Sequence, residues 1–144
     1  MGDYVMKIAK QYYTAIRRLK KKADSLFQEV GLKLEPNCVV CSKKATLRHH
    51  VIAKSLSSGL RHDILNGVSM CWSCHTRFHA TGDMMIYEKI ISSMTAKQIE
   101  HIKANRNKVI KPSKENYLLA IKQLEIYGKM EIQRGVPSTK KKNR

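Results

Sequence analysis

Four cysteines and five of the six histidines of this 144-residue chain fall between residues 38 and 79. The cysteines form two C-x2-C pairs, Cys38/Cys41 and Cys71/Cys74. One such pair can wrap two thiolates around a metal ion, and two pairs together complete a tetrahedral four-sulfur shell. Because a four-sulfur shell leaves no open position for a substrate, we predict that its ion, Zn²⁺, is structural.

The histidines of this stretch form a second set of candidate ligands. His49 and His50 are adjacent in sequence, whereas His75 and His79 lie four residues apart. If residues 71–80 form a helix, His75 and His79 lie one above the other on the same face and can bind one metal ion together. Taken singly, each histidine could instead be an ordinary structural or surface residue, and His75 could be a spare zinc ligand beside the cysteines.

The order of these residues resembles that of the HNH endonucleases, also called ββα-metal nucleases, in the form of the family that contains a structural zinc ion. The resemblance covers under a third of the chain, and it looks most like small phage-type nucleases of this family. It rests on nine positions: Cys38, Cys41, His49, His50, Asn66, Cys71, Cys74, His75 and His79.

The resemblance implies a role for each residue of the candidate active site. His49, His75 and His79 become ligands of a catalytic divalent ion, and His50 becomes the general base that deprotonates the attacking water. Asn66 braces the loop between the two strands and helps to hold the general base. Many relatives carry an acidic residue where His49 stands, so the expected ion shifts toward softer metals: Mn²⁺, Ni²⁺ or Zn²⁺, with Mg²⁺ as a further candidate.

Two classes of function follow from these residues. In the first, the protein is a metal-dependent DNA endonuclease that hydrolyses phosphodiester bonds and leaves 5′-phosphate and 3′-hydroxyl ends, as the resemblance implies. In the second, it is a non-catalytic, zinc-stapled module that binds DNA or RNA, and Asn66 is then a plain turn residue before Gly67. His50 separates the two classes, because a binding module has no use for an unliganded imidazole at that place.

The net charge of +17 predicts a polyanionic partner, with nucleic acid as the first expectation and an anionic membrane surface as the rival. No segment approaches the roughly 20 consecutive apolar residues of a membrane span, so DNA is the expected partner. The cations expected to contact it lie in the first helix and near the histidines: Arg17, Arg18, Lys20, Lys21, Arg48 and Arg61.

The cysteines also bear on the compartment. The first residues contain no apolar signal-peptide centre, and cysteines at C-x2-C spacing in a reducing compartment are far more often metal ligands than disulfides. We therefore expect a cytoplasmic protein, which could be phage-encoded and act in the cytoplasm of a host.

Residues 1–35 predict a basic helical arm. From Val5 to Val30 apolar residues recur every three or four positions, which is the pattern of a single stripe along a helix. Gly31 is expected to end this helix. A second copy of the helix could pair with the first, which would give a homodimer.

Residues 36–82 are expected to form the HNH core. A first strand is predicted over residues 46–52 and a second, antiparallel strand over residues 68–70, with a turn at Asn66 and Gly67. The helix over residues 71–80 then follows. Strand, loop, strand and helix is the order that the ββα fold requires.

The remaining residues predict a C-terminal helical extension over residues 83–136 and a basic, disordered tail over residues 137–144. The whole chain is therefore expected to have an α+β, mainly helical fold. Its ββα-metal (HNH) core holds the structural zinc, and a long N-terminal helix and C-terminal helices flank that core.

Overall fold

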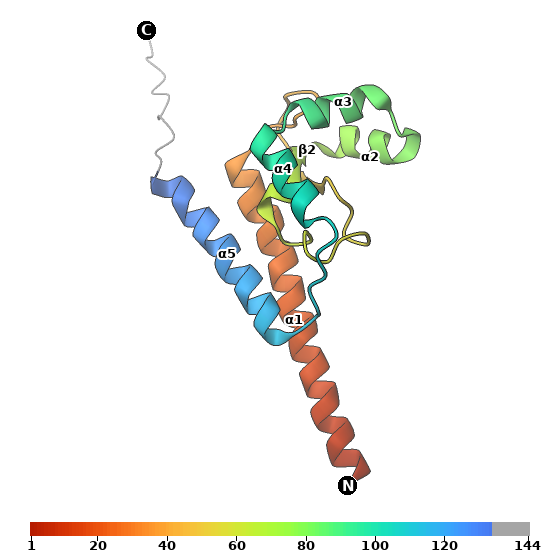
Figure 1. The fold of residues 1–144 in the computed structure, drawn as a ribbon, viewed down its shortest axis with the longest axis vertical. Coiled ribbons are helices and arrows are strands. Elements are labelled where there is room, and N and C mark those ends of the chain that lie inside the picture. The colour runs from red at the N-terminus through yellow and green to blue at the C-terminus, as the bar shows by residue number, and fades with distance from the viewer. Residues whose placement is uncertain (134–144) are drawn as a thin grey trace.

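In a computed structural model that describes residues 1–133, five α-helices accompany a two-stranded antiparallel sheet (Figure 1). In chain order the elements are α1 (Gly2–Leu34), β1 (Leu47–His50), the 3₁₀ helix η1 (Ile64–Asn66), β2 (Gly67–Met70), α2 (Trp72–Thr81), α3 (Met84–Ser92), α4 (Ala96–Asn105) and α5 (Lys114–Gln133). The α+β, mainly helical fold with a ββα core is confirmed. The predicted tail, residues 137–144, lies outside the described residues, and the division of the chain into domains stays a prediction.

The sequence predicts that helix α1 ends at Gly31. In the structure the helix continues to Leu34. Gly31 is buried inside the helix, and a Cβ built on it would lie 2.6 Å from Nε of Arg48. Glycine at position 31 therefore lets the helix pack closely against the buried Arg48, and it does not end the helix. Pro36, two residues beyond Leu34, is compatible with an end of the helix at that point.

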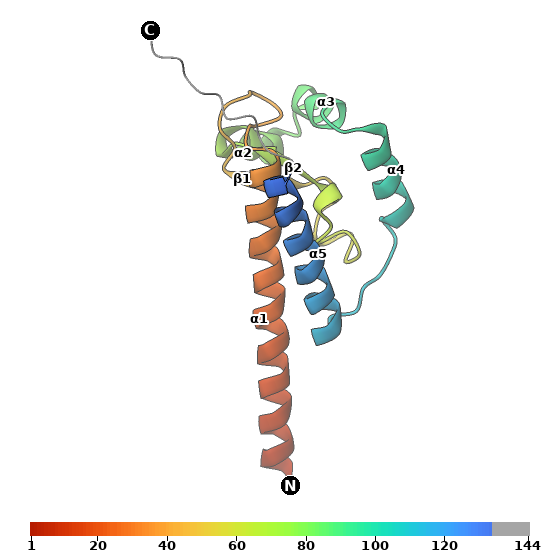
Figure 2. The same cartoon turned by 90° about the vertical axis from the view of Figure 1, so that its left-hand side faces the viewer.

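Helices α1 and α5 run side by side in the same direction (Figures 1 and 2). Phe27 and Val30 of α1, Ile64 of η1 and Leu124 of α5 form a buried apolar cluster between them. The N-terminal part of α1 extends beyond the start of α5 and is not covered by any other described element (Figure 2). Within residues 1–133, no helix has both the length and the apolar character that crossing a membrane requires.

The two strands pair antiparallel, with Leu47 opposite Met70 and His50 opposite Gly67. The predicted turn at Asn66 and Gly67 is wrong, because Asn66 ends the 3₁₀ helix and Gly67 begins β2 with extended dihedral angles, φ −135° and ψ 149°. A Cβ on Gly67 would meet Phe27 of α1 at 2.8 Å. The glycine is thus required where α1 lies directly on the hairpin.

The opposite side of the hairpin packs on the other helices. A second apolar cluster joins the loop before β1, the loop before η1, strand β2, helices α2, α3 and α4, and the turn between α3 and α4: Cys38, Val40, Leu60, Val68, Met70, Cys74, Ile86, Ile90, Met94 and Ile102. Helix α2 ends at Gly82, whose φ of 61° lies in the left-handed region that glycine adopts readily. The hairpin is therefore held between α1 on one side and α2, α3 and α4 on the other.

Candidate active site and metal centres

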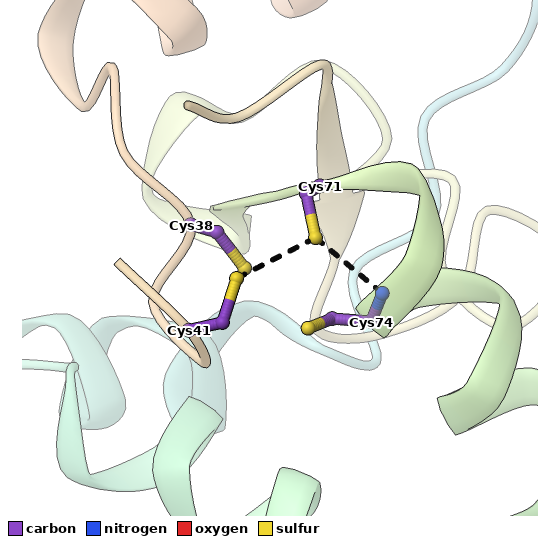
Figure 3. A group of neighbouring side chains, drawn as sticks. All are labelled: Cys38, Cys41, Cys71 and Cys74. Carbon is purple, nitrogen blue, oxygen red and sulfur yellow. Dashed lines mark hydrogen bonds between the residues drawn. The ribbon is translucent and has the colours of Figure 1, made fainter. Parts of the chain in front are cut away.

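The four cysteine sulfurs lie within 4.8 Å of one another, and none is in a disulfide (Figure 3). Cys38 and Cys41 come from the loop before β1, whereas Cys71 and Cys74 come from the start of α2. The Sγ atoms of Cys41 and Cys71 are 3.7 Å apart. Two thiolates bound to one tetrahedral zinc ion by bonds of about 2.3 Å would be about 3.8 Å apart, so the cluster fits a zinc ion.

Local backbone structure brings the two cysteine pairs together. In the first pair, the amide of Ser42 donates to the carbonyl of Cys38 at 2.9 Å, and Ser42 adopts a left-handed φ of 63° that reverses the chain. The amide of Val39 donates to the carbonyl of Ser69 at 3.0 Å, which joins this loop to β2. Cys71 is the N-cap of α2, and its sulfur accepts from the amide of Cys74.

Burial, and after it the neighbouring cysteine sulfurs, raise the pKa of the Cys74 thiol to about 12. The cluster therefore resists carrying several thiolates unless a cation is bound among them. Zinc binding at this cluster would release protons and would add free energy to the fold.

The histidine cluster lies one turn further along α2. His49 of β1 and His75 and His79 of α2 each offer one ring nitrogen, and these nitrogens lie within 4.8 Å of one another. The Nε2 atoms of His75 and His79 are 3.1 Å apart. Two imidazole nitrogens on one ion, with bonds of about 2.0–2.1 Å, would be about 3.3 Å apart, so this donor set also fits a metal. His49 is buried and His79 is exposed, so the cluster is open to solvent on one side.

The environment favours neutral rings at this site. Burial, and then the neighbouring His75, His79 and His50, lower the pKa of His49 to about 4. Burial and then His79 also lower the pKa of His75. A neutral imidazole has a lone pair to offer, so at neutral pH these nitrogens can bind a cation without first losing a proton.

His50 lies against α1 instead of against the histidine cluster. Its ring stacks on Phe27, with 4.3 Å between ring centroids and 17° between ring planes. Its Nε2 is 2.9 Å from the backbone carbonyl oxygen of Arg61. A carbonyl oxygen can only accept, so Nε2 carries the proton and the neutral ring keeps its lone pair on Nδ1. Burial is the largest influence on the pKa of His50 and lowers it to about 4, so the ring is neutral at physiological pH.

Asn66 is fully buried and uses its side chain to close the loop between the strands. Its Oδ1 accepts from the amide of Ile52 at 2.8 Å, and its Nδ2 donates to the carbonyls of Ile52 at 2.9 Å and Leu60 at 3.1 Å. These bonds tie the beginning of the loop to its later part. A plain turn residue would leave this amide in solvent, so the geometry favours the bracing role over the turn alternative.

Residues 38–81 match the protein-family model described as HNH endonuclease. This segment is an HNH domain. It spans both cysteine pairs, the hairpin and α2, and it supports a nuclease-type function and a nucleic-acid substrate in general. Comparison with curated proteins and with solved structures gives no significant match. The placement among phage-type nucleases stays a prediction.

Arg48 of the HNH domain does not have the role that we predicted for it. Its side chain is buried, and its Nη1 donates to Glu35 at 2.6 Å and to Ser69 at 3.1 Å. Burial lowers its pKa, and the adjacent Glu35 carboxylate opposes that shift. The prediction of a nucleic-acid contact is wrong for Arg48, because its charge is paired inside the protein, where it joins α1 to the hairpin.

The prediction for Arg61 also needs correction. Its Nε and Nη2 donate to the two carboxylate oxygens of Asp24 on α1, both at 2.9 Å. The side chain is thus engaged with α1 and does not point a free cation at a phosphate. The remaining predicted cations, Arg17, Arg18, Lys20 and Lys21, all lie on α1, where Lys20 is half-buried and the other three are exposed.

Sequence patterns did not identify the α1 residues that contact the HNH domain. Asp24 and Phe27 support the segment around His50, and the side-chain amide of Gln28 bonds to both the amide and the carbonyl of Arg48, at 2.6 and 2.9 Å. They lie outside the matched segment and have no metal-ligand spacing. The one signal in the sequence was that they belong to a long amphipathic helix with an apolar face to bury.

Proposed function

We propose that this protein is a metal-dependent DNA endonuclease that hydrolyses phosphodiester bonds and leaves 5′-phosphate and 3′-hydroxyl ends. The observation that carries the proposal is the three-histidine cluster at the open side of an HNH domain, adjacent in the chain to a histidine with its lone pair on Nδ1. An inert binding module would gain nothing from that arrangement.

Two different ions are proposed for the two clusters. The four sulfurs would hold a structural Zn²⁺, and His49, His75 and His79 would hold a catalytic divalent ion. Three imidazoles favour Mn²⁺, Ni²⁺ or Zn²⁺ over Mg²⁺, which prefers oxygen ligands. When bound, the catalytic ion would neutralise charge on the scissile phosphate and stabilise the departing 3′ oxygen.

His50 is the proposed general base. Its Nδ1 takes a proton from a water molecule as the water oxygen bonds to phosphorus, opposite the 3′ oxygen. The bond from phosphorus to the 3′ oxygen breaks, the 3′ oxygen takes a proton from solvent, and the phosphate stays on the 5′ side. Throughout, Nε2 keeps its hydrogen bond to the carbonyl of Arg61, which stabilises the positive charge that the ring acquires. Asn66 supports this step by bracing the loop that contains the carbonyl.

The substrate is proposed to be DNA that lies partly along α1. Arg17, Arg18 and Lys21 are exposed on this helix and Lys20 is partly exposed, as suits cations that contact a phosphate backbone without reading sequence. Such contacts would add affinity and a steep dependence on salt. They would not select a particular base sequence.

A homodimer through α1 is proposed from a different face of the same helix. Val5, Ile8 and Tyr12 continue the apolar stripe of α1 beyond the start of α5, and they are 61%, 49% and 50% exposed. A second copy of α1 would cover this stripe, and a dimer would present one active site to each DNA strand. Sedimentation of the protein and of a Val5→Asp/Ile8→Asp variant tests this, since the variant should be monomeric and an already monomeric wild type would contradict the dimer.

The test of the enzymatic proposal is nicking of supercoiled plasmid in Mn²⁺, Ni²⁺ or Mg²⁺. Wild-type protein should convert the plasmid to open circles, and His50→Ala should lose this activity although it still binds DNA. Glu29→Ala is the control, because Glu29 is exposed on α1, pairs with Lys33 and belongs to neither cluster. Equal, negligible nicking by wild type and His50→Ala, with tight DNA binding by both, would instead establish the non-catalytic module.

A further inference from the structure

Helix α1 lies outside the HNH domain, yet two of its side chains act on the surroundings of His50. Phe27 stacks on the His50 ring. Asp24, one turn earlier on the same face of the helix, binds the guanidinium of Arg61 through both carboxylate oxygens. The carbonyl of that same Arg61 accepts the hydrogen bond from Nε2 of His50.

We propose that Asp24 is a positioning residue for the general base His50, acting through Arg61, and that Phe27 holds the same imidazole by its face. This inference rests on the proposed function and extends it: the catalytic centre would include α1 as well as the HNH domain.

The geometry of one peptide group carries the argument. The carbonyl that accepts from His50 belongs to the peptide bond between Arg61 and His62. Both flanking side chains are held by Asp24, because Nε2 of His62 is 2.7 Å from Oδ1 of Asp24. A peptide plane whose two neighbouring side chains are bound to one carboxylate has little freedom to rotate. The direction of its carbonyl, and so of Nε2 of His50, is therefore fixed from α1.

Asp24 is suited to this role because it stays ionised. Burial raises its pKa, but hydrogen bonds from His62 and Arg61 outweigh that effect and lower its pKa well below the usual range. The pair of Asp24 with Arg61 is partly shielded from water, with side chains 34% and 22% exposed. A bidentate pair in such a setting defines an orientation as well as supplying attraction.

Phe27 adds a second constraint on the same ring. The nearly parallel stacking keeps the imidazole plane in place, while the hydrogen bond to the carbonyl prevents a flip that would exchange the two nitrogens. With the plane and Nε2 both fixed, the lone pair on Nδ1 has one direction. A general base must be held within hydrogen-bond reach of the proton that it removes, so this direction matters for the rate.

The loop has other attachments, so loss of Asp24 should leave the protein folded. Asp63 accepts from His101 of α4 at 2.6 Å, and the amide of Gly59 donates to the carbonyl of Lys108 at 3.1 Å. Asn66 ties the loop to itself independently of α1. Asp24→Ala should therefore free the carbonyl of Arg61 to rotate, while the loop itself stays folded.

The experiment compares plasmid cleavage by wild type, Asp24→Ala and Asp24→Glu under saturating metal. Asp24→Ala should lower kcat by about 10- to 100-fold, the scale expected when a catalytic group is slightly misplaced, while KM stays the same. Asp24→Glu keeps a carboxylate and should recover part of the loss. The matched control is Glu29→Ala, which breaks an exposed ion pair with Lys33 on the same helix and should leave kcat unchanged.

A double variant tests the route through Arg61. If Asp24 acts through Arg61, Asp24→Ala/Arg61→Ala should lose no more kcat than the more affected single variant, whereas multiplied losses would overturn the inference. A lower KM in Asp24→Ala would also contradict it, by showing that a released Arg61 binds phosphate. Thermal unfolding and zinc content are measured for every variant, and a kcat loss matched by a loss of either would make Asp24 merely structural. An unchanged kcat in Asp24→Ala with an active wild type refutes only this inference, whereas an inactive wild type refutes the proposed function itself.

Discussion

The cysteine cluster and the histidine cluster are built from the same two parts of the chain, but their surroundings differ. Each takes residues from the region of β1 and from α2, and along α2 the cysteines are followed directly by the histidines. The cysteine cluster has four sulfur donors, two of them buried, which fill a tetrahedral shell. The histidine cluster has three nitrogen donors and an exposed edge at His79. One short helix thus contributes residues both to a site suited to stabilising the fold and to a site suited to chemistry.

The largest expected effect concerns the cysteine cluster and its proposed structural role. Cys41→Ala removes one sulfur of the proposed zinc shell, and zinc binding at such sites contributes on the order of 10 kcal/mol or more to folding. We expect the variant to lose zinc and cooperative unfolding together, as measured by metal analysis and circular dichroism. A variant that stays fully folded in the presence of chelator would show that the cysteines are not a structural metal site.

The next largest effect concerns the histidine cluster and its proposed catalytic ion. His79→Ala removes an exposed ligand of the histidine cluster, so activity should require on the order of 100-fold more Mn²⁺ while zinc content and thermal stability stay at wild-type values. The measurement is the metal dependence of nicking beside a thermal melt. Identical metal dependence in wild type and variant would exclude His79 from the site.

A smaller effect concerns the packing of α1 against the hairpin. Gly67→Ala places a Cβ against Phe27 and Arg48, which have little room to move between α1 and the hairpin. We expect a loss of about 1–3 kcal/mol in unfolding free energy, as for overpacked cores, with the zinc site retained. Denaturant unfolding gives the value, and a neutral result would mean that α1 does not press on β2 as closely as described.

The smallest effect concerns the arm alone. Arg17→Ala or Lys21→Ala removes one exposed cation of α1, so DNA affinity should fall a few-fold and the slope of log K against log salt should decrease by about one. The kcat at saturating DNA should not change. Binding isotherms at several salt concentrations measure this, and an unaltered slope would place the DNA elsewhere on the surface.

The two clusters of candidate metal ligands were predictable because the residues of each pair follow a local spacing. Cysteines three residues apart and histidines one helical turn apart bring their donors together through local backbone geometry, which a sequence displays directly. The order of strand, loop, strand and helix was predictable for the same reason, since each element has its own local pattern.

The supporting residues were not predictable, because their roles come from long-range packing. Gly31 and Gly67 read as a helix stop and a turn, yet each lies where α1 and the hairpin approach closely. Arg48 read as a phosphate contact, yet Glu35 neutralises it in the interior. No local pattern around Asp24 predicts its ion pair with Arg61, which lies 37 residues further along the chain.

The most direct test of the account is a crystal structure of zinc-purified protein soaked in Mn²⁺, with anomalous data that distinguish the two elements. The account predicts zinc among the sulfurs of Cys38, Cys41, Cys71 and Cys74, and manganese among ring nitrogens of His49, His75 and His79, with Nε2 of His50 still on the Arg61 carbonyl. Histidines without an ion among them, or His50 itself bound to the metal, would contradict it.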